Sequence, residues 1–246
     1  MRPDLAWQAS LFDDGPVGVD TSFAHLRRIG LDDRSWVDYC PEWLAGSDEV
    51  FALLLQSARW QQREVWMYER RVPEPRLTAG WQVRAERSTD ESEDDTDDDT
   101  DDDTDDGALG RTGVDDLATP PVLREVANRL SERYRVRFDS IWVNLYRDGR
   151  DSVAWHGDRN ARTQVNPLVA TVSLGGRRAF LLRPRAGSQK SGGGTDASGR
   201  RVRLDPGHGD LVVMGGACQH DWLHTVPKTT KPVAPRMSVT IRHSVP

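Results

Sequence analysis

Residues 138–146 read FDSIWVNLY, and residues 236–245 read RMSVTIRHSV. Apolar side chains alternate with other side chains in both stretches, which is the two-residue period of a β-strand with one face in a core. The apolar face of the two stretches carries Ile141, Val143, Leu145, Met237, Val239 and Ile241. The opposite face carries Trp142, Asn144, Tyr146, Arg236, Ser238, Thr240 and Arg242. We expect each strand to bury the first face and to present the second to a ligand or to solvent.

Other short β-like runs surround these two, and Gly-rich turns separate several of them. They are LVATVSLG at residues 168–175, RRAFLLR at 177–183 and GDLVVMG at 209–215. Further upstream, residues 64–72 alternate like one more strand, which Pro73 ends because proline cannot donate to a β-ladder. The second half of the chain is therefore predicted to be dominated by short strands.

Two helices are predicted ahead of these strands. Residues 48–58 (DEVFALLLQSA) read as a helix with Ser47 or Asp48 as its N-cap. Residues 121–134 (PVLREVANRLSERY) read as an amphipathic helix with proline in its first turn. Leading helices followed by many short strands predict a mostly β (α+β) fold, a sandwich or barrel with the helices on one side.

The predicted domain spans residues 46–246, after an irregular, Gly- and Pro-containing extension over residues 1–45. An acidic insertion at about residues 88–107 interrupts it, and residues 90–106 hold 13 carboxylates with no Lys or Arg. Like charges repel and nothing apolar is available to bury, so we expect disorder there. Although the whole chain has a formal net charge of -6, the remainder without this tract is basic, which favours a phosphate-bearing partner.

The cysteine count and the apolar runs bear on the compartment. Cys40 and Cys218 are too few for a disulfide framework, so we expect a cytoplasmic or other reducing intracellular location. The opening MRPDLAWQASLFDD has no apolar run of signal-peptide length. No run of about 18 apolar residues is present, so no membrane span is predicted.

Trp155-His156-Gly157-Asp158 suggests a metal site. Alternate residues of a strand point to one side, so His156 and Asp158 can bind one ion together. A distant histidine would complete a face of two histidines and one carboxylate, which is typical of non-haem Fe(II) oxygenases. Spacing alone does not choose this histidine among four candidates: His208, His220, His224 and His243. A structural role for any single histidine is the competing interpretation.

Arg236 and Arg242 share one face of the last strand. Guanidinium groups bind carboxylates in a bidentate manner, so a polar face with two arginines fits a dicarboxylate-shaped ligand. A strand face with its arginines in water is the alternative. Asn144 and Tyr146 could hydrogen-bond the same ligand, or they are ordinary polar residues on a half-exposed strand.

Three segments together resemble the AlkB family of Fe(II)- and 2-oxoglutarate-dependent nucleic-acid dealkylases. They are VPEPRLTAGW at residues 72–81, NLYRDGRDSVAWHGD at 144–158, and the run from GDLVVMGGACQHDWLHTVPK to APRMSVTIR at 209–242. The combined order of Asn-x-Tyr, His-x-Asp, a distal His and Arg-x5-Arg is specific. The resemblance covers the chain from about residue 48 to its end.

The resemblance implies a double-stranded β-helix (jelly roll) with flanking N-terminal helices and a nucleotide-recognition lid. It implies that the Fe(II) ligands are His156, Asp158 and His224. It also implies that 2-oxoglutarate is held by Asn144, Tyr146, Arg236 and Arg242, with Arg236 on the distal carboxylate. Apart from His224, these are the residues that the strand patterns single out.

The activity that the resemblance implies is oxidative dealkylation of N-alkylated bases in DNA or RNA, using O2 and 2-oxoglutarate, and we expect the protein to act as a monomer. Its products are formaldehyde, succinate and CO2, and the target base must leave its stack. Two other functions stay open. One is a 2-oxoglutarate-dependent hydroxylase of a protein or small molecule, and the other is a non-catalytic nucleic-acid binding module.

Two positions bear on the substrate. Asn160 lies two residues after Asp158, where many AlkB relatives have an acidic residue, and it either contacts the base or caps a turn. Trp81 either stacks on a base or packs in the core. The acidic tract occupies the place where a lid element with tyrosine is expected, and this keeps the hydroxylase alternative open.

Overall fold

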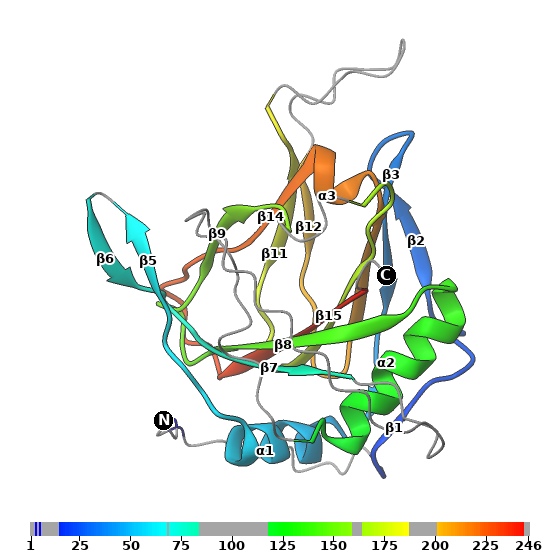
Figure 1. Ribbon diagram of the computed structural model, residues 1–246, viewed down its shortest axis with the longest axis horizontal. Coiled ribbons are helices and arrows are strands. Elements are labelled where there is room, and N and C mark those ends of the chain that lie inside the picture. Colours follow the sequence, from blue (N-terminus) through cyan, green and yellow to red (C-terminus); the bar gives the residue numbers. More distant parts are fainter. Residues whose placement is uncertain are drawn as a thin grey trace, which may run out of the picture.

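The computed structural model describes residues 15–67, 69–83, 118–158, 164–186 and 201–243, together with Pro3 and Leu5. Two antiparallel sheets dominate this part of the chain (Figure 1). The larger sheet has the order β2 (Arg27–Gly30), β3 (Ser35–Cys40), β13 (Leu211–Gly216), β10 (Val169–Gly175), β15 (Arg236–His243), β8 (Phe138–Tyr146) and β7 (Leu77–Gln82). The smaller sheet has the order β12 (Val202–Leu204), β11 (Phe180–Pro184), β14 (Trp222–Val226) and β9 (Val153–His156).

Strands β8 to β15 form a jelly roll. Along the chain, β8, β10, β13 and β15 enter the larger sheet, whereas β9, β11, β12 and β14 enter the smaller one. Eight antiparallel strands shared in this way between two sheets define the double-stranded β-helix. The predicted fold class, a mostly β jelly roll with flanking helices, is therefore confirmed.

Two apolar cores follow from the alternation of side chains. Residues of β8 such as Ile141 and Val143 belong to the core between the larger sheet and the helices, where α1 (Ser47–Ser57) packs against β10 and α2 (Pro121–Tyr134) against β8. Tyr146 faces the other way, into the core that joins the two sheets. The space between the sheets is thus the interior toward which the polar strand faces point.

The helices begin as their sequences dictate, with one difference. Proline occupies the first turn of α2, whose bounds match the predicted ones. The N-cap of α1 is Gly46 with φ 62°, and not Ser47 or Asp48. A Cβ at Gly46 would lie 2.6 Å from the Val17 backbone, so this close approach requires glycine. Ser47 instead donates its hydroxyl to the Leu44 carbonyl at 2.6 Å.

Two segments differ from their predicted structure. Residues 15–45 are not an irregular extension, because β1 (Gly18–Val19) pairs with β4 (Leu44–Ala45) and β3 pairs with β13 of the jelly roll. Residues 64–72 do not form one strand: β5 (Glu64–Met67) pairs with β6 (Arg70–Pro73) as a hairpin. The turn contains Glu69 with φ 61°, a backbone state that the alternating pattern does not reveal.

The acidic tract and most of the Gly/Ser-rich segment before β12 lie outside the described residues, so their predicted character stays a prediction. In the part of the chain that the structure describes, none of the helices is long and apolar enough to cross a membrane. The remaining short helix, α3 (Cys218–Asp221), connects β13 to β14 next to the candidate site.

Candidate active site

The smaller sheet places two histidines side by side. Strands β9 and β14 are neighbours, and His156 is the direct cross-strand partner of His224. Their ring centroids are 4.2 Å apart, and the Phe180 ring lies 5.4 Å from that of His224. His224 is buried with 9% of its surface exposed. The β-register therefore singles out His224 from the other histidines as the partner of His156.

Both imidazoles are in the form that binds metal ions. His156 Nδ1 lies 2.8 Å from the Ala154 carbonyl, and because a carbonyl only accepts, Nδ1 carries the proton and Nε2 keeps its lone pair. Burial lowers the pKa of His156 and holds the pKa of His224 well below its usual value, and the charge of Arg242 adds to both effects. Neutral imidazoles result at neutral pH.

Asp158 lies at the end of β9, where the chain is held against α3. Its backbone N–H donates to Gln219 Oε1 at 3.0 Å, and Gln219 is fully buried. A Cβ at Gly157 would lie 2.8 Å from the Gln219 carbonyl oxygen, so glycine is needed for this approach. The Asp158 carboxylate forms an ion pair with Arg242 Nε.

The ion pair between Asp158 and Arg242 bears on which of the predicted metal ligands lie close together. His156 and His224 are adjacent, but β9 ends at His156, so Asp158 lies two residues beyond the strand that was expected to carry it, and its carboxylate contacts Arg242. Within the described residues, no group of three or more His, Cys, Asp or Glu side chains is gathered closely enough to hold a metal ion. Arg242 contacts one oxygen of this carboxylate, Oδ2, and the structure brings the two histidines together without gathering Asp158 with them.

The predicted ligand-facing residues of β8 and β15 meet in register. Tyr146 is the cross-strand partner of Arg236, and Asn144 is the partner of Ser238. Arg242 lies further along the same strand, opposite Ser140. Asn144, Tyr146 and Arg236 thus lie on one continuous face, as the alternation predicted.

Arg236 has unused hydrogen-bonding capacity in the interior. Its side chain is 1% exposed, and Nη2 donates to Ser173 Oγ at 2.8 Å. Among the described residues, Nε and Nη1 have no hydrogen-bond partner. A buried donor without a partner costs about 1–3 kcal/mol, and more when it is charged. A carboxylate placed beside Arg236 could accept from either of these groups, so this residue fits the end of a dicarboxylate such as 2-oxoglutarate.

Two arginines at the site were not predicted. Arg76 donates Nε to Asn144 Oδ1 at 3.2 Å and Nη2 to Glu74 Oε1 at 2.8 Å, which fixes the amide of Asn144. The guanidinium of Arg178 lies 5.9 Å from the Tyr146 ring centroid, and that of Arg236 lies 5.5 Å from it. Arg76 belongs to VPEPRLTAGW, so a signal was present, whereas the position of Arg178 depends on tertiary contacts.

The two predicted substrate residues have different outcomes. Trp81 is 2% exposed and belongs to the core between the larger sheet and the helices, opposite Ile141 of β8. This burial supports the packing alternative for Trp81 and leaves its ring inaccessible to a base. Asn160 lies outside the described residues, so its role stays a prediction.

Comparison with known proteins places this geometry in a family. Residues 39–242 match the model of the 2OG-Fe(II) oxygenase superfamily. The chain is 31% identical over 217 residues to the bovine (Bos taurus) alpha-ketoglutarate-dependent dioxygenase alkB homolog 3, covering 86% of this chain and 67% of that protein. It is 38% identical over 126 residues to the human (Homo sapiens) protein of that name, covering 51% of this chain and 43% of the relative.

A plant protein with a different name also matches part of the chain. The chain is 35% identical over 138 residues to the Arabidopsis thaliana DNA oxidative demethylase ALKBH2, covering 50% of this chain and 43% of that protein. The matches to the human and plant proteins thus span less than half the length of either relative. The family model, in contrast, covers most of this chain, including both histidines and both arginines of the site. The chain therefore belongs to the 2OG-Fe(II) oxygenase superfamily and, within it, to the AlkB family.

Proposed function

We propose that the protein removes N-linked alkyl groups from nucleic-acid bases by oxidation, acting on DNA or RNA. Membership of the superfamily brings Fe(II), 2-oxoglutarate and O2 as its requirements. The observation that carries the proposal is the pair of unused N–H groups on buried Arg236, in the same interior as two adjacent neutral imidazoles. This interior offers one place for an anion and one for a divalent cation.

The donor set fits Fe(II). Two neutral imidazoles and one carboxylate, from His156, His224 and Asp158, form the facial set typical of non-haem iron oxygenases. When bound, the iron supplies the oxidation, in which O2 gives one oxygen atom to the succinate formed from 2-oxoglutarate and the other to the alkyl carbon. The hydroxylated carbon of an N-methyl group then leaves the base as formaldehyde, and the base regains a hydrogen.

The residues of this chain have separate tasks in that reaction. Arg236 would hold the distal carboxylate of 2-oxoglutarate, with Tyr146 beside it and the amide of Asn144 fixed by Arg76. Arg242 contacts the Asp158 carboxylate and would orient this ligand. The buried side chains around His224, such as Phe180, keep bulk water from the reacting groups.

Nucleic acid is the proposed partner for two reasons. The names of the similar proteins include a DNA oxidative demethylase and alkB homologues. Outside the tract at residues 90–106, the chain is basic, which suits a polyphosphate backbone. We propose further that the protein acts as a monomer in a reducing intracellular compartment, where buried Cys40 and Cys218 stay as thiols.

One assay tests the proposal. The protein is incubated with Fe(II), 2-oxoglutarate and ascorbate in air, with oligonucleotides that contain 1-methyladenine or 3-methylcytosine. We expect restored bases together with stoichiometric formaldehyde and succinate, and no reaction with His156→Ala. Succinate without base repair would instead indicate a hydroxylase of another substrate. Binding of the oligonucleotide without turnover would indicate a non-catalytic binding module.

A further inference from the structure

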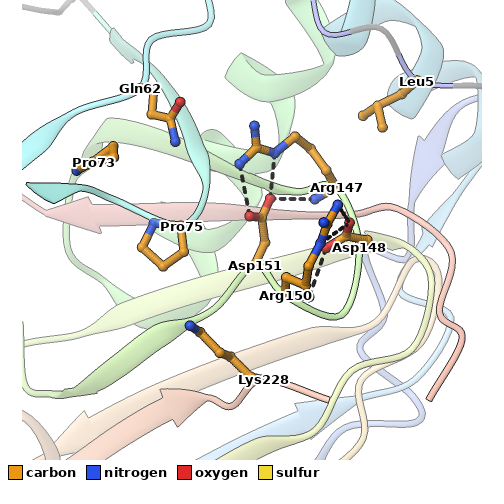
Figure 2. A pocket seen from close by; sticks show the side chains of 9 residues that line it. All are labelled: Leu5, Gln62, Pro73, Pro75, Arg147, Asp148, Arg150, Asp151 and Lys228. Carbon is orange, nitrogen blue, oxygen red and sulfur yellow. Dashed lines mark hydrogen bonds and ion pairs between the residues drawn. The ribbon is translucent and has the colours of Figure 1, made fainter. Parts of the chain in front are cut away.

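A cavity of about 590 Å³ has none of the proposed metal or 2-oxoglutarate ligands in its lining (Figure 2). Its walls are Leu5, Gln62, Pro73, Pro75, Arg147, Asp148, Arg150, Asp151 and Lys228. Apart from Leu5, which precedes β1, these residues come from the foot of the β5–β6 hairpin, from the turn between β8 and β9, and from the connection between β14 and β15. Its volume is in the range of ordinary ligand sites.

The carboxylates of the cavity are already neutralised within its own wall. Asp151 accepts from Arg147 through Nε at 2.8 Å and Nη2 at 2.9 Å. Asp148 accepts from Arg150 through Nε at 3.0 Å and Nη2 at 2.7 Å, and this arginine lowers the pKa of Asp148. Figure 2 shows both arginine–aspartate pairs side by side. Neither carboxylate is left to oppose an incoming anion.

Lys228 is the remaining charge in the lining. Its side chain is exposed, and no hydrogen bond or ion pair joins its ammonium group to another of the described residues. Figure 2 shows the end of this side chain extending toward Pro75, on the side opposite Gln62 and Leu5. The lining therefore has one uncompensated positive charge, and a lysine ammonium acts as a point charge for phosphate.

The two loops that carry these charges are fastened to each other. Thr229 N–H donates to the Gly149 carbonyl at 2.8 Å, and a Cβ at Gly149 would lie 2.2 Å from the Thr229 carbonyl oxygen. Arg178, which is 4% exposed, donates to the carbonyls of both loops. Its acceptors are Asp148 at 2.9 Å, Asp151 at 2.9 Å and Pro227 at 2.7 Å. The site is thus held ready before a ligand arrives.

The cavity is adjacent to the site along the chain as well as in space. Its wall residue Pro75 precedes Arg76, which contacts Asn144, and its wall residue Arg147 follows Tyr146. The Pro75 carbonyl also accepts from Ser152 N–H at 2.9 Å, at the start of the strand that carries His156. The cavity and the candidate site are therefore built on the same segments of the chain, and a strand bound at the site could present a neighbouring phosphate to the cavity.

We infer that this cavity binds a single backbone phosphate of the substrate strand next to the base in the site, with Lys228 as its cation. The inference rests on the proposed function, since it assumes a nucleic-acid strand in the neighbouring site. A phosphate held there would fix the register of the strand without reading its sequence. Arg178 donates to the carbonyls of both cavity loops and its guanidinium lies near the Tyr146 ring. It would therefore keep the phosphate site and Tyr146 in a fixed relative position.

The test compares Lys228→Gln with Lys231→Gln, a matched change of an exposed lysine in the same connection that does not line the cavity. Binding of a single-stranded oligonucleotide with one 3-methylcytosine is measured over a salt series. We expect Lys228→Gln to weaken binding about fivefold at low salt. It should also reduce the slope of log affinity against log salt by about 0.7. Lys231→Gln should change neither quantity appreciably.

A second measurement locates the contact. Single methylphosphonate substitutions are scanned along the oligonucleotide, and at one phosphate near the lesion the effects of the methylphosphonate and of Lys228→Gln should not add. Equal losses for both lysine variants, or additive effects at every phosphate, would overturn the inference. A wild-type protein that neither binds nor repairs any alkylated oligonucleotide would instead overturn the proposed function, so the two failures can be told apart.

Discussion

The Asp158 carboxylate, at the end of β9, is paired with the Arg242 guanidinium on β15. The same carboxylate is the proposed third ligand of the iron, so Arg242 competes with the cation for it. Arg242 also adds positive charge next to both histidines. Arg242 and a bound cation would therefore both draw on this one carboxylate, whose Oδ2 atom contacts the guanidinium.

Replacing Arg242 with Gln should tighten the binding of a divalent cation when 2-oxoglutarate is absent. A hydrogen bond to a charged group contributes about 1.5–3 kcal/mol, so removing the competitor should improve affinity by about tenfold or more. Calorimetric titration with Mn(II) under argon measures this directly. Unchanged or weaker Mn(II) binding by Arg242→Gln would contradict the competition.

Replacing Arg236 with Met should uncouple stability from the co-substrate. The ligand-free variant should be at least as stable as the wild type, because two buried N–H groups without partners are removed. Adding 2-oxoglutarate with Mn(II) should raise the Tm of the wild type but give the variant only the rise seen with Mn(II) alone. A full 2-oxoglutarate-dependent rise in the variant would show that the distal carboxylate binds elsewhere.

The fall in unfolding free energy at mildly acidic pH should depend on His243. Burial lowers the pKa of His243, and its Nε2 accepts from Leu168 N–H at 3.2 Å, which requires the neutral ring. The unfolded state, with a pKa of about 6.5, therefore binds a proton first as the pH falls. This contribution to stability is complete above that pH and is lost as the pH drops through the lowered folded value.

His243→Gln should accordingly flatten the fall in unfolding free energy between pH 7 and pH 5, measured by urea denaturation. Glutamine can still accept from Leu168 N–H, but it does not titrate. His25→Gln, a change of an exposed histidine, serves as the control and should leave the slope as it is. If the unfolding free energy of His243→Gln fell with pH as steeply as that of the wild type, His243 would not be the cause of the fall.

Deleting the acidic residues 88–107 should tighten binding to unmodified oligonucleotides at low salt. The tract concentrates negative charge on a chain that is otherwise basic, so it competes with phosphates for the same cations. Filter binding at two salt concentrations, with and without the deletion, measures this. Unchanged affinity would show that the tract is only a solvated insertion.

The local parts of the fold were predictable because their causes are local. The alternation in β8 and the proline that opens α2 specify an element within a few residues. The strand β3 was missed because its partner β13 lies far along the chain, and Glu69 was missed because its positive φ closes a hairpin without glycine. Pairing of distant strands is not specified by the sequence pattern of either strand alone.

The residues of the candidate site also fall into two groups, those that the local sequence pattern predicts and those that depend on contacts between distant segments. Asn144, Tyr146, Arg236 and Arg242 could be assigned to strand faces from alternation. The choice of His224 required the register between β9 and β14, and the roles of Arg76 and Arg178 required contacts between segments far apart in the sequence. The resemblance to a family supplied the register indirectly, since it named His224 before any strand pairing was known.

We propose that His156, Asp158 and His224 hold one ferrous ion while Arg236 holds 2-oxoglutarate. A crystal structure of the protein soaked anaerobically with Fe(II) and 2-oxoglutarate tests it most directly, with anomalous scattering at the iron edge to identify the metal. We predict one iron peak within coordinating distance of a ring nitrogen of each histidine and of an Asp158 oxygen. A peak elsewhere, or Asp158 still bound only to Arg242 beside an occupied metal position, would contradict the account.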